Sequence, residues 1–154
     1  MLKSSLLLIC VVTCGVGVYA FAQDHGAEPK SLPAAQQHGG ESVKLLAVRD
    51  IQEKLDGQAA AATAVLVTIA PGEAGAPHRH PGPVLVYVLE GEYELGIDDQ
   101  PTKLYKAGET FYEPTGCLHR VSKNPAAKGT TRLLAWVLHP RDAKDVAVQE
   151  KMKH

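Results

Sequence analysis

Short apolar segments, separated by glycine and proline turns, run through most of this chain and limit what it can fold into. The segment 64–69 is rich in Val, Thr and Ile, which favour the extended backbone of a buried strand. Turn signals flank such segments at Asp56–Gly57, Pro71–Gly72 and Glu90–Gly91. The predicted strands lie at 59–70, 84–89, 92–97, 102–105, 110–112, 118–122 and 131–138. This spacing predicts an all-β sandwich or barrel, in which about eight to ten strands close around a small interior.

The segments on either side of these strands are less regular. Residues 43–55 mix apolar and charged side chains whose spacing fits both a strand and a helix, so we expect a strand followed by a short helical turn. Residues 141–154 are charged and follow Pro140, which predicts a C-terminal tail that is helical or frayed. The folded domain is therefore expected to span residues 43–140.

The N-terminal residues have the features of a secretory signal peptide. Lys3 precedes a short apolar run, and Ala20 and Ala22 supply the small residues that a cleavage site needs. We expect residues 1–22 to be a signal peptide cleaved after Ala22, with an uncleaved anchor as the alternative. Residues 23–42 are polar and rich in small residues, which predicts a flexible linker. The mature protein is expected to be periplasmic or secreted, with no membrane association after cleavage.

Length and charge narrow the class of protein further. A chain of 154 residues holds one ordinary domain. Removal of residues 1–22 takes away Lys3, so the formal net charge changes from -1 to -2. It also leaves Cys117 as the single cysteine, so an internal disulfide is excluded. Near-neutral charge without basic clusters argues against a nucleic-acid partner.

Two histidines stand close together just before the apolar segment 84–89. In an extended chain, residues i and i+2 point to the same side, so His78 and His80 can converge on one ion while Arg79 points away. Pro77 and Pro81 restrict the backbone on either side of them. This arrangement makes the pair a candidate for metal binding.

The chain resembles the cupin superfamily at two motifs between residues 72 and 124. The matching positions are Gly72, His78, His80 and Gly91 in the first motif, and Gly108, Pro114, Gly116, His119 and Asn124 in the second. The resemblance implies a cupin-type double-stranded β-helix, a jelly-roll barrel in which His119 meets the other two histidines. Where the family usually has a ligand glutamate, this chain has Val84. The implied metal site therefore consists of His78, His80 and His119.

Three neutral imidazoles suit a divalent transition metal, and Zn, Fe, Ni, Cu and Mn all remain open. Loss of the carboxylate weakens the binding of hard ions such as manganese most. The resemblance implies a metal-dependent oxygenase, for example a dioxygenase, that acts on a small organic molecule. No catalytic residue is assigned. The alternatives are a non-catalytic cupin of the cell envelope that binds a metal or small ligand, and a structural cupin whose site has decayed.

Other side chains near the motif histidines are expected to have different roles. Glu113 precedes Pro114 and is interpreted as a solvated bend residue rather than a carboxylate partner or base. Cys117 is expected to be a small buried thiol rather than a ligand. Tyr87 and Tyr112 are expected as core or rim aromatics, Arg120 as an outward salt-bridge partner, and His139 as a surface or core residue.

The resemblance also implies a homodimer. Cupin domains pair through sheet edges or an exchanged N-terminal strand, and an open sheet edge is a template for another chain. We expect residues 43–51 to form the contact.

Overall fold

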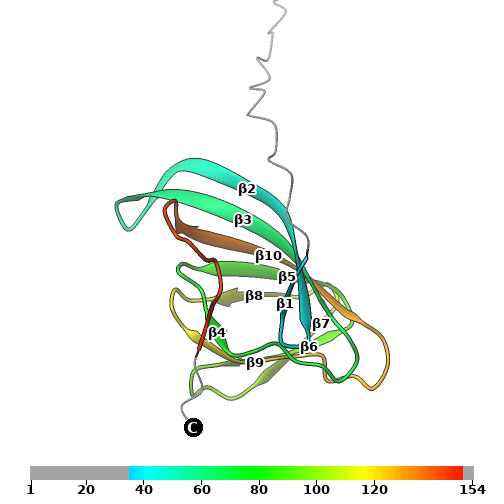
Figure 1. The fold of residues 1–154 in the computed structure, drawn as a ribbon. Helices are drawn as coiled ribbons and strands as arrows, with labels where there is room; N and C mark the ends of the chain where they lie inside the picture. The colour runs from blue at the N-terminus through cyan, green and yellow to red at the C-terminus, as the bar shows by residue number, and fades with distance from the viewer. Residues whose placement is uncertain (1–34, 151–154) are drawn as a thin grey trace, which may run out of the picture.

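The computed structural model describes residues 35–150, and this range contains eleven β-strands and no helix. The predicted signal peptide, residues 23–34 of the predicted linker and residues 151–154 lie outside the described part of the chain. Within residues 35–150, no helix has the length and apolar character needed to cross a membrane. The strands form two antiparallel sheets that enclose a common interior (Figure 1).

The larger sheet has six strands in the order β1-β2-β3-β10-β5-β8. Their bounds are β1 (Gln36–His38), β2 (Glu41–Leu55), β3 (Gln58–Ile69), β10 (Thr131–Pro140), β5 (Val84–Glu90) and β8 (Thr110–Glu113). The smaller sheet has five strands in the order β11-β4-β9-β6-β7. Their bounds are β11 (Val148–Gln149), β4 (His78–Arg79), β9 (Leu118–Lys123), β6 (Glu92–Ile97) and β7 (Lys103–Lys106). The all-β jelly-roll fold expected from the sequence is confirmed.

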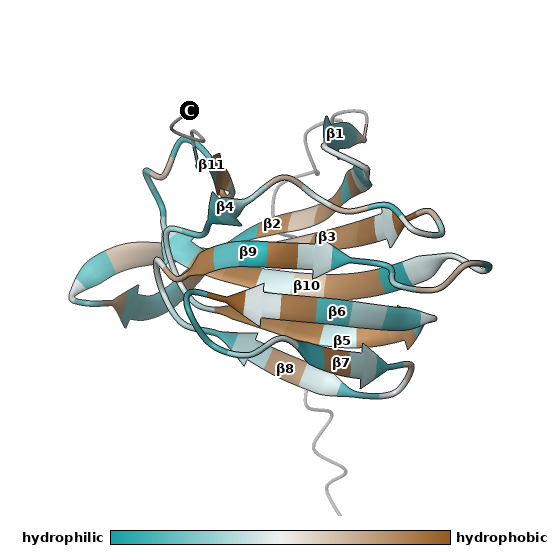
Figure 2. Ribbon diagram, turned by 90° about the horizontal axis from the view of Figure 1, so that it is seen from below, coloured by the Kyte–Doolittle hydropathy of each residue, from teal (hydrophilic) through white to brown (hydrophobic). Residues whose placement is uncertain are grey.

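Alternating burial along the strands builds the core between the sheets. In β10, Leu133, Ala135 and Val137 point inward, while Trp136 between them is exposed. Strand β5 alternates in the same way. Successive side chains of a strand point to opposite faces, so each strand contributes one apolar row to the interior. Apolar segments are visible along β3, β5 and β10 in Figure 2, whereas the short strands β1 and β4 are hydrophilic.

The segment 43–55 differs from its prediction. It belongs to one strand, β2, that continues to Leu55 without a helical turn and pairs with β3 throughout. The register shifts between Leu45 and Ala47 and again between Ile51 and Lys54. Such bulges place an extra residue in the strand and change which side chains face inward. The apolar positions therefore do not follow a strict period of two, which explains the ambiguity in the sequence.

Both ends of the predicted domain extend further than expected. Residues 36–38 pair with 41–43, so the predicted linker does not reach residue 42. At the other end, β11 pairs with β4, and the described part of the C-terminal tail is not helical (Figure 1). Both segments complete sheet edges through backbone hydrogen bonds, which side-chain composition does not reveal.

Candidate metal centre and cavity

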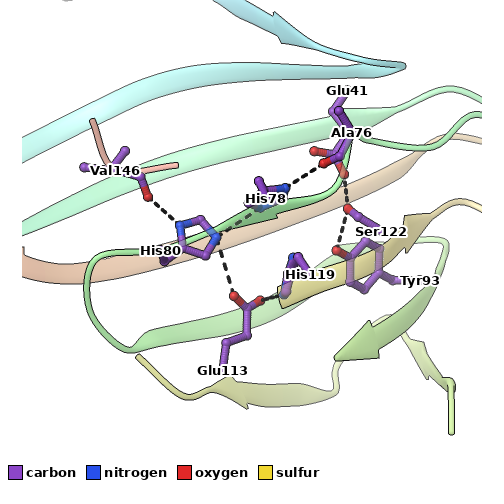
Figure 3. A network of polar contacts seen from close by, with 9 residues as sticks. All are labelled: Glu41, Ala76, His78, His80, Tyr93, Glu113, His119, Ser122 and Val146. Carbon is purple, nitrogen blue, oxygen red and sulfur yellow. Dashed lines mark hydrogen bonds and ion pairs between the residues drawn. The ribbon is translucent and has the colours of Figure 1, made fainter. Parts of the chain in front are cut away.

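The three predicted histidines lie together between the sheets. His78 and His119 are direct cross-strand partners in the pairing of β4 with β9, and His80 follows β4 (Figure 3). The ring centroid of His78 lies 4.8 Å from the centroids of both His80 and His119, and the centroids of His80 and His119 are 5.6 Å apart. One ligating nitrogen from each ring lies within 4.8 Å of the others. The geometry therefore brings all three side chains to one point.

Backbone carbonyl groups orient two of the rings. Nδ1 of His78 lies 2.9 Å from the carbonyl oxygen of Ala76, and Nδ1 of His80 contacts that of Val146. A carbonyl oxygen can only accept, so Nδ1 carries the proton and Nε2 keeps its lone pair. The two Nε2 atoms lie 3.1 Å apart. Both rings thus present a metal-binding lone pair to the same space.

Burial keeps these imidazoles neutral. Desolvation lowers the pKa of His78 to about 4, more than the hydrogen bond to Ala76 raises it. Desolvation also lowers the pKa of His80, although the nearby carboxylate of Glu113 opposes this change. Neutral imidazole is the form that binds metal. Near neutral pH the two rings are therefore ready to bind an ion.

Glu113 is the functional residue that sequence reasoning misplaced. It is buried, with only 2% of its surface exposed, rather than solvated. Its Oε1 lies 2.9 Å from Nε2 of His119 and its Oε2 lies 3.6 Å from Nε2 of His80. The pattern in β8 offered a signal, because an inward Phe111 requires Glu113, two residues later, to point inward as well.

The position of Glu113 explains how the chain tolerates Val84. The two residues are cross-strand partners in the pairing of β5 with β8. Directly paired residues project to the same face of a sheet. The carboxylate that the family motif usually supplies from the first motif thus comes from the adjacent strand.

Unsatisfied buried atoms show that these residues fit a metal ion. Although His119 Nε2 and Glu113 Oε1 are close, their geometry does not make a hydrogen bond. Within the described range, both ring nitrogens of His119 and Oε2 of Glu113 are buried without a hydrogen-bond partner. Unpaired buried polar atoms are costly and call for an explanation. A divalent cation held by three imidazoles and a carboxylate would satisfy Nε2 of His119 and the Glu113 oxygen.

The site opens into a cavity of about 320 Å³ between the two sheets. Its walls are largely apolar and include Val65, Val86, Phe111, Leu133 and Val137. A volume of this size accommodates a small organic molecule. The cavity therefore supplies space for a ligand beside the histidines.

A second polar group lies on the cavity wall. Glu41, 5% exposed, accepts a hydrogen bond from the hydroxyl of Ser122, whose Oγ lies 2.8 Å from the Tyr93 hydroxyl. Desolvation raises the pKa of Glu41 to about 7, and the hydrogen bond from Ser122 opposes this only in part. The sequence placed this residue in a flexible linker, so its role was missed.

The other candidates lie apart from the three-histidine cluster. Cys117 is a buried thiol, as expected, and burial raises its pKa to about 11, which disfavours the metal-binding thiolate. His139 is a core residue that bonds to Thr63 at 2.8 Å. Arg120 points outward but donates to the carbonyl groups of Asp98 and Gln100 rather than forming the expected salt bridge. Tyr87 and Tyr112 are exposed and face away from the core.

Comparisons with known proteins agree with the fold and the motif. A family model described as "Cupin domain" matches residues 65–137. Germin-like protein subfamily 2 member 4 of Arabidopsis thaliana is 35% identical over 75 residues, which cover 46% of this chain. The same alignment covers 34% of the relative, so the chain spans about a third of its length.

Two solved structures show the same fold at low identity. The polyketide cyclase RemF from Streptomyces resistomycificus matches with a TM-score of 0.54 at 20% identity, over 82% of this chain and 85% of RemF. A Bacillus subtilis oxalate decarboxylase, studied for its Mn(II) centres, matches with a TM-score of 0.55 at 20% identity, over 76% of this chain and 30% of the enzyme. The "Cupin domain" model over residues 65–137, together with the paired motifs and the jelly-roll topology, identifies the chain as a member of the cupin superfamily.

Proposed function

We propose that this cupin is a metal-dependent enzyme, an oxygenase that acts on a small organic molecule. The observation that carries the proposal is the convergence of His78, His80 and His119 with the buried carboxylate of Glu113 on an apolar cavity. Three nitrogen donors and one oxygen donor suit Zn, Fe, Ni and Cu, and the carboxylate makes Mn acceptable as well. The Mn(II) centres named for the B. subtilis oxalate decarboxylase support a divalent ion in this fold.

The chain's own residues define what the centre would accept. A bound cation would supply positive charge and free coordination positions for oxygen atoms. Glu113 offsets one of its two charges, so a ligand that binds as an anion is favoured. The apolar walls exclude water and favour an organic body. These features support a small chelating substrate such as a diketone, phenol or related enol.

The proposal is tested by metal content. We expect the purified protein to bind a divalent metal and His119→Ala to bind it much more weakly, because the ion loses one of its three imidazole donors. Arg120→Ala is the matched control, since Arg120 neighbours His119 but points outward. Both variants should keep the β circular dichroism of the wild type. A wild-type protein that takes up none of Zn, Fe, Mn, Ni and Cu in calorimetry contradicts the proposal.

Oxygen uptake separates the enzyme from a non-catalytic binding protein. The metal-loaded protein is incubated with a panel of diketones, phenols and thiols, and dioxygen consumption is recorded. Consumption that His119→Ala abolishes supports an oxygenase. Ligand binding without dioxygen consumption or product formation indicates a non-catalytic binding protein.

We also propose that the protein is exported to the periplasm or secreted. The support is the signal-like pattern of residues 1–22. N-terminal sequencing of the native protein should begin at Gln23. An intact Met1 in a soluble intracellular fraction contradicts this proposal.

A further inference from the structure

Glu41 is a buried carboxyl group in the cavity, remote in sequence from the metal-binding motifs. It lies at the start of β2 and lines the same cavity as His78 and His119. Ser122 donates a hydrogen bond to Oε1, and the Tyr93 hydroxyl is then free to donate to Ser122. Figure 3 shows Glu41, Ser122 and Tyr93 grouped on one side of the histidines and Glu113 on the other. A ligand among the histidines would therefore have a carboxyl group on either side.

The loop before β4 is shaped around this carboxyl group. A Cβ atom at Gly75 would collide with the carboxyl carbon and oxygens of Glu41. The N–H group of Gly75 donates to the carbonyl oxygen of Ser122 at 2.8 Å, which holds the loop against β9. The same loop leads directly into His78. Glu41 thus lies against the segment that carries two of the histidines.

The surroundings of Glu41 adjust its proton affinity to the physiological range. Its pKa is raised to about 7, mainly because burial disfavours the charged carboxylate and in smaller part because of the charge of Glu113. The Ser122 hydrogen bond and a charge on His119 lower it. Tyr93 beyond Ser122 stays protonated, because burial raises its pKa well above the ordinary value. A carboxyl group in this environment can take up and return a proton near neutral pH.

We propose that Glu41 is the proton acceptor for a ligand that binds as an anion at the histidine–Glu113 centre. The ligand class is a small compound with an acidic O–H group beside a second oxygen atom, such as an enol, phenol or hydroxamic acid. Its O–H bond breaks, a new O–H bond forms on Glu41, and the negative charge passes from Glu41 to the ligand oxygen. Nothing is oxidised or reduced in this step. The assignment rests on the proposed function, because a cation must balance the ligand's charge.

Calorimetry that counts released protons tests this assignment. The full-length protein is loaded with nickel rather than zinc, because zinc-bound water itself titrates near neutral pH. Acetohydroxamic acid is then titrated at pH 8 into protein in two buffers of different ionisation enthalpy, and the difference in heat gives the number of protons released. Wild type should release almost none, since Glu41 retains the proton. Glu41→Gln should release about one per ligand bound.

Two controls keep the outcome decisive. Glu53→Gln removes the same charge from an exposed position of β2 and should behave as wild type. For the wild type, the number of protons released should rise as the pH is lowered from 8 to 6, because a growing fraction of Glu41 is already protonated before the ligand binds. Equal release by wild type and Glu41→Gln, or release by wild type that is the same at both pH values, overturns the role of Glu41 but leaves the metal centre intact. Failure to bind nickel or any of the other four ions overturns the proposed function, and this role with it.

Discussion

A single cross-strand pair decides the proposed donor set of this cupin. Val84 occupies the position where the family motif usually carries a glutamate, and Glu113 faces it from β8. Both side chains are almost fully buried. Because paired residues of β5 and β8 project to the same face of the sheet, a carboxylate at either position can reach the histidines. The proposed donor set therefore keeps a carboxylate although the motif is changed.

Exchanging the two residues tests this interpretation. We expect Glu113→Gln to lower metal affinity by roughly tenfold or more, because a neutral amide replaces the charged donor. The double variant Val84→Glu with Glu113→Val should recover most of that affinity, since the carboxylate returns from the opposite strand. Isothermal calorimetry with nickel or manganese measures both changes. Affinity that is insensitive to Glu113→Gln shows that the carboxylate does not bind the ion.

Glu41 makes the stability of the metal-free protein depend on pH. Its pKa of about 7 in the folded protein lies above the ordinary value of 4.5, so the folded protein holds this proton more tightly than the unfolded chain. The resulting stabilisation is complete below pH 4.5 and is lost as the pH rises through 7. The glutamine in Glu41→Gln cannot ionise, so the stability of this variant should not fall with pH for this reason.

Denaturant unfolding at two pH values measures the effect. For each protein the free energy of unfolding is measured at pH 5 and at pH 8. The advantage of Glu41→Gln over wild type should be larger at pH 8 than at pH 5, by up to about 3 kcal/mol. Chelator-treated protein is used so that metal does not contribute. If the free energies of unfolding of the two proteins change with pH in the same way, the raised pKa of the buried Glu41 is contradicted.

The shortest strands have a large influence on the site. Strand β4 contains only His78 and Arg79, and it is held between β9 and β11. Arg79 is tied to Glu150 at 3.1 Å and to the carbonyl oxygen of Gly116 at 2.7 Å. The carbonyl oxygen of Val146, just before β11, orients His80. The C-terminal segment therefore supports the site that was predicted to lie wholly within residues 43–140.

Truncation of the C-terminal segment tests its contribution. A chain that ends at Asp145 loses β11 and the carbonyl partner of His80. Metal affinity should fall roughly tenfold or more, because partners that orient a ligand typically contribute that much. A chain that ends at Glu150 keeps these contacts and serves as the control. Equal metal affinity of the two truncated proteins, measured by calorimetry, would contradict this role.

At the scale of the whole molecule, β2 leaves an open edge. Its residues 41–43 pair with β1 on one side, whereas residues beyond Val43 pair only with β3 among the described strands. Leu46 and Val48 on this segment are exposed apolar residues. An open edge with exposed apolar side chains is a template for another chain. The homodimer expected through residues 43–51 remains a prediction.

A charge on this edge tests the dimer. Wild type should have the mass of a dimer in light scattering at micromolar concentration. Leu46→Lys should shift it toward the monomer, because a lysine on an exposed edge opposes pairing between strands. Leu46 is absent from the cavity wall, so metal binding should be unaffected. A monomeric wild type contradicts the prediction.

The features that the sequence determines by itself are local. Alternation of side chains places His78 and His80 on one side, and the spacing of short apolar segments specifies strands and turns. The tertiary structure decided which distant segments complete the site. Glu41 meets Ser122 across 81 residues, and His80 meets Val146 across 66. Such contacts depend on how strands pair and where sheet edges close, and these are set by backbone hydrogen bonds that are not encoded in any local pattern. For the same reason, the position of Glu113 opposite Val84 became visible only once β8 was paired with β5.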